Sequence, residues 1–387
     1  MSDVMRIVRW RWFSPLIAAL VITTIALIPL GLDPLSNTTD FGIYAVSYVI
    51  FALGLNIVVG FAGLLDLGYV AFYAIGAYSA GWFASNHFSA INGGKGVYVG
   101  VDKGSLVTQQ GIHVNFLVLL VLAALIASIG GAIIGLPTLR LRGDYIAIVT
   151  LAFGEIAFTI ANNGNELHIG KYTLTEGQNA ISPIDEPKLP LFHTFDRALS
   201  LRGYFWLGLA MAVIVVLINL SLRDSRLGRA WVAIREDEVA AVSMGVPLVR
   251  TKLLSYAIGA ALGGCAGAYL GTYTSAINAT QFKFSFSIFV LAMVILGGLG
   301  SIWGTVIGAV ILTYIDRQFI PGTLDSIDIQ GKLGLNFSFN DLGFGIFGFL
   351  LVLLMILRPQ GLFPERRRKL ELTEGIGSDE SVYEARV

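Results

Sequence analysis

Long apolar runs without charged residues limit the possible folds of this chain more than any other feature. The first such run, residues 13–32, contains no charged side chain. An α-helix rises about 1.5 Å per residue, so about 20 apolar residues cross the roughly 30 Å of hydrocarbon in a bilayer. Charged residues make up 13% of the 387-residue chain, against about 25% in an average soluble domain. The sequence therefore predicts an all-α polytopic membrane protein.

About ten runs have the length and apolarity of a membrane-spanning helix. The two shortest runs, 286–299 and 302–315, are joined by a Gly-rich stretch. The other predicted spans are 13–32, 41–60, 67–83, 116–136, 145–161, 204–222, 254–273 and 342–357. These spans place a membrane domain at residues 1–369, followed by a polar, acidic tail at 370–387.

The distribution of Lys and Arg predicts the orientation of the spans, because cytoplasmic connections are enriched in these residues. If the N-terminus is cytoplasmic, the basic clusters at 6–11, 223–252 and 366–369 all fall on the cytoplasmic side. An even number of spans then returns the C-terminus to the same side. We therefore expect both termini in the cytoplasm. We also expect the first helix to stay uncleaved, because its apolar run exceeds a usual signal-peptide core.

Several functional classes have no support in the sequence. The net charge is +0, so no basic surplus indicates nucleic-acid binding. The single cysteine, Cys265, excludes an internal disulfide, and the histidines form no i,i+4 pair that would predict a metal site. Neither Gly170-Lys171 nor Gly331-Lys332 is followed by Ser or Thr, so neither is a phosphate-binding loop. We expect a chain that is not an enzyme and binds no cofactor, so that any ATP is hydrolysed by another polypeptide.

Three polar side chains occur within or beside the predicted spans. Asn56 lies well inside one span, Glu155 lies in the middle of another, and Asp66 lies between two spans. A carboxylate at the membrane centre costs about 2.5–3.5 kcal/mol on insertion scales, so such groups usually face a cavity or a partner. We predict that Asn56, Asp66 and Glu155 line a substrate pathway. The alternatives are hydrogen bonds between helices, burial of a neutral Glu155, and capping of the following helix by Asp66.

Glycines at every fourth position mark several of the spans. Gly259, Gly263, Gly267 and Gly271 form the longest such stripe. This spacing places small residues on one helix face and lets two backbones approach closely. The pattern predicts tight helix packing, with a glycine-lined substrate route as the other interpretation.

The cytoplasmic loop at 223–252 is the most informative part of the sequence. Residues 229–244 follow an amphipathic helical pattern, which Gly245 and Pro247 end. The residues predicted to share one face are Ala230, Ala233, Ile234, Ala240, Ala241 and Met244. A short, charged helix with a small-residue face suits a groove on a cytoplasmic partner. A helix lying on the lipid surface is the alternative, although the acidic run at 236–238 weakens attraction to anionic lipid.

This loop resembles the cytoplasmic coupling helix in the permeases of ABC importers, which carries an E-A-A-x-x-x-G core. Glu238, Ala240, Ala241 and Gly245 give E-x-A-A-x-x-x-G, one residue off in the spacing of the Glu. The usual I-x-L-P ending is absent. The loop therefore resembles a coupling helix through part of the motif.

Other stretches resemble the branched-chain amino-acid permeases within that class. The stretches G-L-N-I-V-V-G-F-A-G-L-L-D-L-G at 54–68, L-R-L-R-G-D-Y at 139–145 and R-P-Q-G-L-F at 358–363 look like signatures of this family. The Arg-rich run at 228–237 is similar to that of the LivM-type subunit. The resemblance covers most of residues 54–363.

The resemblance implies one subunit of an ATP-driven importer in the bacterial plasma (inner) membrane. A second, homologous permease would complete the pore, and two cytoplasmic subunits would bind ATP and Mg. An extracytoplasmic binding protein would deliver leucine, isoleucine or valine, and substrate would cross by alternating access. ATPase coupling would fall to a coupling helix at about 228–246, with the residues Gly228, Arg229, Ala230, Ile234, Arg235, Glu236, Asp237, Glu238, Ala240, Ala241 and Gly245.

Two extracytoplasmic regions depart from the family pattern. Family members often carry T-G-G-x-N-G-[IL] after the fifth span, whereas residues 175–181 read T-E-G-Q-N-A-I. The loop at 84–115 is longer than usual, and with the loop at 162–203 it forms either a lid or docking surface or a solvated connector. Because these regions face arriving substrate, urea or a short amide stays an alternative substrate. An ion-coupled secondary transporter that uses Glu155 and Asp66 stays open as a different class.

Overall fold

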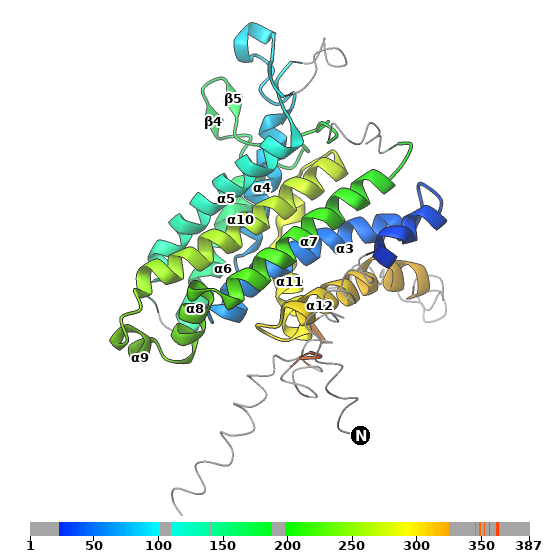
Figure 1. Ribbon diagram of the computed structural model, residues 1–387. Helices are drawn as coiled ribbons and strands as arrows, with labels where there is room; N and C mark the ends of the chain where they lie inside the picture. The colour runs from blue at the N-terminus through cyan, green and yellow to red at the C-terminus, as the bar shows by residue number, and fades with distance from the viewer. Residues whose placement is uncertain are drawn as a thin grey trace, which may run out of the picture.

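Long helices run side by side through the molecule (Figure 1). The computed structural model describes residues 23–100, 110–139, 141, 143–187, 198–324, 345, 348–349, 352, 356 and 361–363. Five of the described helices are long and apolar enough to cross a membrane. Short strands gather at one end of the helices, here called the strand end, and the helix pair α8 (Arg226–Glu236) and α9 (Glu238–Ser243) lies at the opposite, α8–α9 end (Figure 1). The expected all-α membrane protein is confirmed.

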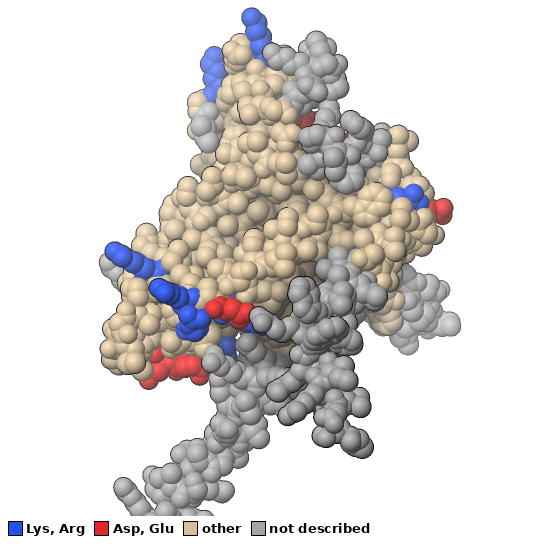
Figure 2. All heavy atoms as spheres, viewed as in Figure 1, with Lys and Arg blue, Asp and Glu red and all other residues tan. Residues whose placement is uncertain are grey.

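Charged side chains mark the two ends of the helices. In the view of Figure 2, Lys, Arg, Asp and Glu gather at these ends, and the surface between them is uncharged. Two helices beside this surface are α5 (Phe116–Thr138) and α7 (Arg202–Asp224), which expose large apolar side chains. Examples are Val121, Leu125, Ile129, Ile133, Ile214 and Leu217. An apolar band of this kind matches the hydrocarbon core of a bilayer.

Three helices form the centre of the bundle, and their backbones cross closely. They are α3 (Asn37–Leu55), α4 (Val70–Phe83) and α10 (Leu248–Thr274). The glycine stripe of α10 is buried at these crossings. A Cβ on Gly267 would collide with the carbonyl oxygen of Tyr73 in α4. The predicted tight packing is confirmed, because small residues stand where two backbones meet.

Most of the predicted spans correspond to helices. The spans 41–60, 116–136, 145–161, 204–222 and 254–273 each fall on a long apolar helix. The three shorter spans fall on α4, α11 (Phe284–Gly297) and α12 (Ile302–Tyr314), which are helices of 14, 14 and 13 residues. The first half of the first span, 13–22, lies outside the described residues, and its second half is helical at 23–27 and forms η1 (Ile28–Gly31). The last span is described at a few positions, and the tail at 370–387 lies outside the described residues.

Two helices end in wider π-helical turns. α3 continues into η2 (Asn56–Phe61), and α12 continues into η6 (Ile315–Leu324). The helices α11 and α12 form a hairpin against α3, joined by a turn at 298–301, here called the α11–α12 turn. The backbone N–H of Leu362 donates to the Leu296 carbonyl oxygen at 2.8 Å, so a segment close to the C-terminus also meets this hairpin.

The strand end is built from the two long loops predicted from the sequence. β1 (Ala84–Ser85), β2 (Val97–Val99) and β3 (Ile112–Val114) form a sheet in the order β1-β3-β2. β1 pairs antiparallel with β3, and β2 pairs parallel with it. In the second loop, β4 (His168–Ile169) and β5 (Tyr172–Thr173) form an antiparallel hairpin. The short helices η3 (Ile91–Gly94) and η5 (Ala279–Phe282) lie in the neighbouring connections.

Candidate coupling and transport site

The segment predicted as one helix at 229–244 is two helices, α8 and α9. Asp237 separates them with an extended backbone, φ −155° and ψ 110°. Its Oδ1 accepts hydrogen bonds from the backbone N–H groups of Val239, at 2.8 Å, and Ala240, at 3.0 Å. The prediction of one continuous helix is therefore wrong, because Asp237 acts as the N-cap of a new helix. The predicted stop is confirmed, since Gly245 follows α9 with φ of 85°.

α8 is anchored to the membrane helices through its buried face. Trp231 is fully buried, and its indole Nε1 donates to the Thr251 carbonyl oxygen of α10 at 2.8 Å. Gly228 lies against the end of α7, where a Cβ would stand 2.6 Å from the Arg223 carbonyl oxygen. Ile234 is buried as well. These contacts fix α8 between α7 and α10.

α9 presents an apolar surface to the outside of the described structure. Val239, Val242 and Met244 are 68%, 49% and 86% exposed, and we call these three residues the α9 patch. Ala240 is exposed on the same helix, whereas Ala241 is buried. The predicted common face is therefore wrong, because the break at Asp237 changes the direction of α9. The sequence did not indicate Val239 and Val242, since the face expected to meet a partner was assigned from one continuous helix.

The charged residues of the helix pair divide between the surface and the interior. Arg229, Glu236 and Asp237 are exposed, and Ala230 is half-buried. The Arg229 guanidinium donates to the Asp224 carbonyl oxygen at 2.9 Å. Glu238 forms an ion pair with Lys252 of α10, whose side chain is 2% exposed. α9 is thus tied to α10 by this ion pair.

Arg235 reaches from α8 to the last turn of α3. Its Nη1 donates to the Gly60 carbonyl oxygen of η2 at 2.7 Å. The chain then passes close to the same side chain at Gly63, where a Cβ would stand 2.7 Å from Arg235 Cγ. Gly63 has φ of 70°, a conformation that favours glycine. The segment that follows α3 therefore folds around Arg235.

Asn56 lies in the first turn of η2 and is fully buried. Its Oδ1 accepts a hydrogen bond from the backbone N–H of Gly300 at 2.9 Å. The Nδ2 atom has no hydrogen-bond partner among the described residues. Asn56 thus joins the end of α3 to the α11–α12 turn, and its predicted place in a substrate pathway stays a prediction.

Asp66 lies in the connecting segment between η2 and α4 and is 2% exposed. Its Oδ1 accepts a hydrogen bond from the Gly68 backbone N–H at 2.9 Å, two residues before α4 begins. The Leu67 N–H beside it donates to Thr150 Oγ1 of α6 (Asp144–Asn162) at 3.0 Å. Burial raises the pKa of the Asp66 carboxyl to about 7. Asp66 therefore stabilises the turn that leads into α4.

Glu155 lies near the middle of α6 on its exposed face. Ile148 and Ile156 on the same helix are 62% and 51% exposed. The neighbouring Gly154 is buried against Gly68, so the opposite side of α6 packs into the bundle. No hydrogen bond or ion pair to Glu155 is found within the described ranges. An acidic group therefore stands on an apolar helix face that is exposed among the described residues.

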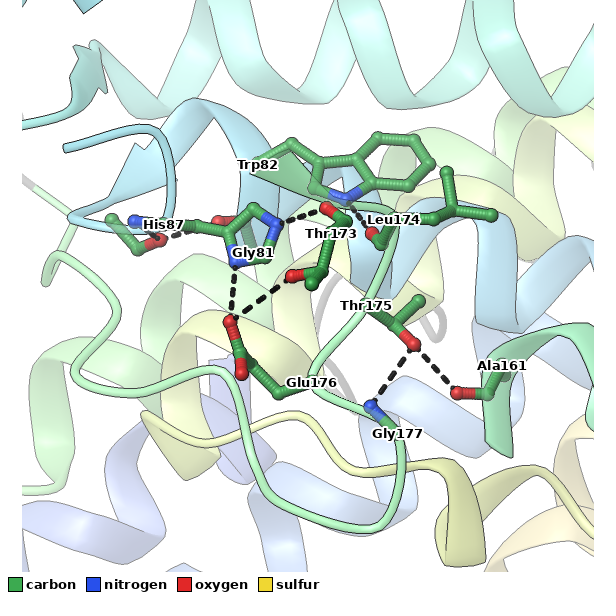
Figure 3. Close-up of polar contacts among 10 residues, drawn as sticks. Gly81, Trp82, His87, Ala161, Thr173, Leu174, Thr175, Glu176 and Gly177 are labelled. Carbon is green, nitrogen blue, oxygen red and sulfur yellow. Dashed lines mark hydrogen bonds and ion pairs between the residues drawn. The ribbon is translucent and has the colours of Figure 1, made fainter. Parts of the chain in front are cut away.

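At the strand end, His87 joins the two long loops (Figure 3). Its Nδ1 lies 3.2 Å from Glu176 Oε1, and its Nε2 lies 2.9 Å from the Thr173 carbonyl oxygen. Both partners are acceptors, and each ring nitrogen of an imidazole can donate one hydrogen bond when it carries the proton. The His87 side chain is 2% exposed, whereas that of Glu176 is 42% exposed. The ion pair is therefore half-shielded from solvent.

The region that departs from the family pattern is part of this junction. Figure 3 shows Thr175 between Ala161 and Gly177. Thr175 Oγ1 donates to the Ala161 carbonyl oxygen at 2.7 Å and accepts from the Gly177 N–H at 3.1 Å. The Trp82 indole of α4 donates to the Leu174 carbonyl oxygen at 2.8 Å. The second loop is therefore held to α6 and to α4 by separate hydrogen bonds.

Long apolar helices, polar groups among them and a helix pair anchored at one end are the features of a multi-pass membrane protein. Residues 37–356 match the family described as the permease component of branched-chain amino acid transport systems. The chain belongs to this family and is a LivM-type member of it.

Curated relatives agree with this assignment. The chain is 36% identical over 364 residues to the high-affinity branched-chain amino acid transport permease LivM of Escherichia coli (strain K12), covering 89% of this chain and 74% of that protein. It is 29% identical to a probable LivM of Methanocaldococcus jannaschii, covering 82% and 91%. It is 27% identical to the LivH permease of the same E. coli strain, covering 69% and 79%. No solved structure matches the chain.

Proposed function

We propose that this chain is one permease subunit of an ATP-driven importer for leucine, isoleucine and valine in the bacterial plasma membrane. The observation that carries the proposal is the 36% identity to the E. coli LivM permease, which extends over 89% of the chain. That relative is named for high-affinity branched-chain amino acid transport. We transfer the substrate class of this relative to the present chain because of that identity.

Two cytoplasmic ATPase subunits would supply the energy, one of them docked on the α9 patch. Val239, Val242 and Met244 offer a small apolar centre, and the exposed Glu236 and Asp237 offer a polar rim. An apolar centre with a polar rim is the usual anatomy of a protein interface. ATP and Mg would be held by those subunits, and this chain would bind no cofactor. The α8–α9 end, both termini and the tail would then be cytoplasmic, with about ten spans in all.

A second, homologous permease would cover the exposed face of α6. A carboxylate that faces lipid at mid-membrane costs about 2.5–3.5 kcal/mol on insertion scales. Glu155 would not face lipid if its helix face lined a polar route between two permease subunits, and the cost would then not arise. We therefore assign Glu155 to the substrate pathway at the subunit interface. The strand end would face the extracytoplasmic binding protein that delivers the amino acid.

Transport would follow alternating access. ATP binding would move the docked ATPases, and α8 would transmit this movement because Trp231 fixes it to α10. The helices would then open the pathway toward the cytoplasm. Substrate selectivity would come largely from the binding protein.

The test is uptake by the purified complex in proteoliposomes, with the binding protein outside and ATP inside. We expect labelled leucine to accumulate with ATP and to be displaced by excess valine, but not by excess urea. Accumulation of labelled urea without leucine uptake would replace the substrate and keep the importer. Uptake driven by a proton gradient without ATP would favour the ion-coupled transporter instead.

A further inference from the structure

The last turn of α3 has an unusual form where it meets α8. η2 spans Asn56–Phe61 as a π-helix, and all six of its residues are buried. The Ala62 N–H donates to the Ile57 carbonyl oxygen at 3.1 Å, five residues back, which continues this wide pattern. Single π-helical turns within α-helices are rare and often lie at functional sites. A regular α-helical pairing of the same residues is the obvious second arrangement.

One side of η2 is bound to the helix pair. The hydrogen bond from Arg235 Nη1 ends on the carbonyl oxygen of Gly60, inside the π-helical segment. A guanidinium that donates to a backbone carbonyl forms a charge-assisted hydrogen bond, which is stronger than a neutral one. Any displacement of α8 therefore acts on η2 through Gly60.

The other side of η2 is bound to the α11–α12 turn. Asn56 Oδ1 accepts from the Gly300 N–H at 2.9 Å. At Gly60 a Cβ would overlap Asn56 Oδ1 and would stand 2.6 Å from the Gly300 nitrogen. Three segments that are distant in sequence therefore meet at Gly60, with no space for a side chain.

We propose that Arg235, η2 and Asn56 form a linkage that transmits movement of α8 to the α11–α12 turn during transport. Arg235 and Asn56 act as positioning residues. Asn56 holds the α11–α12 turn and does not contact substrate. This inference rests on the proposed function, because an ATPase must move α8.

The linkage has the parts of a two-state element. In a π-helix each N–H pairs with the carbonyl five residues back, and in an α-helix with the carbonyl four residues back. A shift of η2 between these two pairings therefore changes the position of Gly60 relative to Asn56. Both hydrogen bonds of the linkage are then broken or exchanged. Asn56 Nδ2 has no partner among the described residues and can donate in the second arrangement. Coupling between distant sites requires a discrete change of this kind.

The first experiment measures leucine uptake per ATP hydrolysed by the complete transporter in proteoliposomes. For Arg235→Gln and Asn56→Leu we expect bound ATPase and continued hydrolysis, with a ratio lower by about tenfold. Asn219→Leu is the matched control, because Asn219 is also fully buried and its Nδ2 bonds to Val215 within α7. Arg223→Gln controls for a surface arginine paired with Asp224. Both controls should keep the wild-type ratio.

The double variant Arg235→Gln, Asn56→Leu tests whether the two residues act through one path. Within one linkage, the ratio should fall no further than in the lower of the two single variants. Losses that multiply would show two independent effects and would overturn the proposal. Equal losses in Asn219→Leu would also overturn it, since any buried asparagine would then matter.

A second measurement covers the case in which Asn56→Leu fails to assemble. Hydrogen–deuterium exchange at residues 296–302 is compared with and without a non-hydrolysable ATP analogue, in the wild type and in Arg235→Gln. We expect the nucleotide to change exchange in the wild type and to lose this effect in the variant. An unchanged nucleotide effect in Arg235→Gln, or its absence in a wild type that has bound its ATPases, overturns the linkage. Failure of the proposed function is distinct, because the ATPases would then not bind.

Discussion

The two ends of the molecule are held together in different ways. At the strand end, the ion pair of His87 and Glu176 and the hydrogen bond from Trp82 to Leu174 tie the second loop to the first loop and to α4. Backbone bridges from Ser85 to Ile184 and from Ile181 to Ile277 add further connections. At the α8–α9 end, among the described residues, α8 is joined to η2 by the hydrogen bond from Arg235 to the Gly60 carbonyl oxygen.

This difference separates a braced strand end from the joint between α8 and η2, although α8 itself is fixed to α7 and α10. Several ties in parallel oppose separate movement of the two loops, because each tie must break before they part. One hydrogen bond into a π-helical turn opposes a change of register far less. A permease that receives movement at one end and substrate at the other would need this asymmetry. The following changes test it, in order of expected size.

The largest effect is expected at the α9 patch. Met244→Glu places a charge at the most exposed apolar residue of the patch, where an ATPase would have to bury it. Loss of a hot-spot residue at the centre of an interface costs about 2 kcal/mol or more, and the roughly 100-fold weaker ATPase binding that we expect corresponds to about 2.7 kcal/mol. Titration of the ATPase subunits onto the purified permease measures this. Val99→Glu, in β2 at 45% exposed, is the control at the strand end and should bind normally.

A smaller effect is expected from Asp66→Asn, which keeps an acceptor for the Gly68 N–H and removes the charge. The pKa of Asp66 is raised by burial to about 7, above its unfolded value of about 4. The folded state then holds the proton more tightly, so the stability of the wild type falls as the pH rises from about 4 to 7. Asp66→Asn should lose this fall and be more stable at pH 8 by about 2 kcal/mol, after allowance for relaxation around a buried charge.

Thermal unfolding of both proteins at pH 5 and pH 8 in one detergent measures this difference. Asp33→Asn, at an exposed position before α3, controls for the loss of a surface carboxylate. Equal pH dependence in Asp66→Asn and the wild type would contradict the role of burial. ATP-driven leucine uptake should persist in Asp66→Asn, whereas its loss would favour Asp66 as an ion carrier.

The next effect is expected at the strand end. His87→Ala removes the hydrogen bond to the Thr173 carbonyl oxygen and the ion pair with Glu176. Hydrogen bonds to charged groups contribute about 1.5–3 kcal/mol, and we use the lower value because Glu176 is partly exposed. Hydrogen–deuterium exchange at residues 172–177 should therefore rise about tenfold, while ATPase binding stays unchanged. His168→Ala is the matched control, since His168 is exposed and bonds to Glu166 within its own loop.

The sequence predicted the membrane helices well because their signal is local. Apolar runs of about 20 residues indicate membrane-spanning helices directly, because their length matches the thickness of a bilayer. The glycine stripe of α10 reports the close approach of two backbones, as at Gly267 and Tyr73. The strands at 84–114 were not predicted, because strands of two or three residues carry no periodic pattern.

The candidate site was less predictable, because its geometry depends on contacts between distant segments. The break at Asp237 had a signal in the sequence, since Asp is a preferred N-cap residue, but the amphipathic pattern outweighed it. Nothing near Asn56 in the sequence indicates that Gly300 is its partner, because the two are joined through the fold of α3 on α11 and α12. The predicted pathway residues thus differ, with Asn56 buried and Glu155 exposed.

The smallest effect is expected from Glu176→Gln, and it bears most directly on the comparison of the two ends. Glutamine keeps an acceptor oxygen for His87 Nδ1 and removes the charge. Because the Glu176 side chain is 42% exposed, solvent screens the ion pair, and we expect a loss of about 0.5 kcal/mol. Exchange at residues 172–177 should rise about twofold, well below the change in His87→Ala. If Glu176→Gln opened the loops as far as His87→Ala does, the strand end would depend on one charge pair. The distinction between the braced strand end and the joint from α8 to η2 would then fail, because each would depend on a single charged side chain.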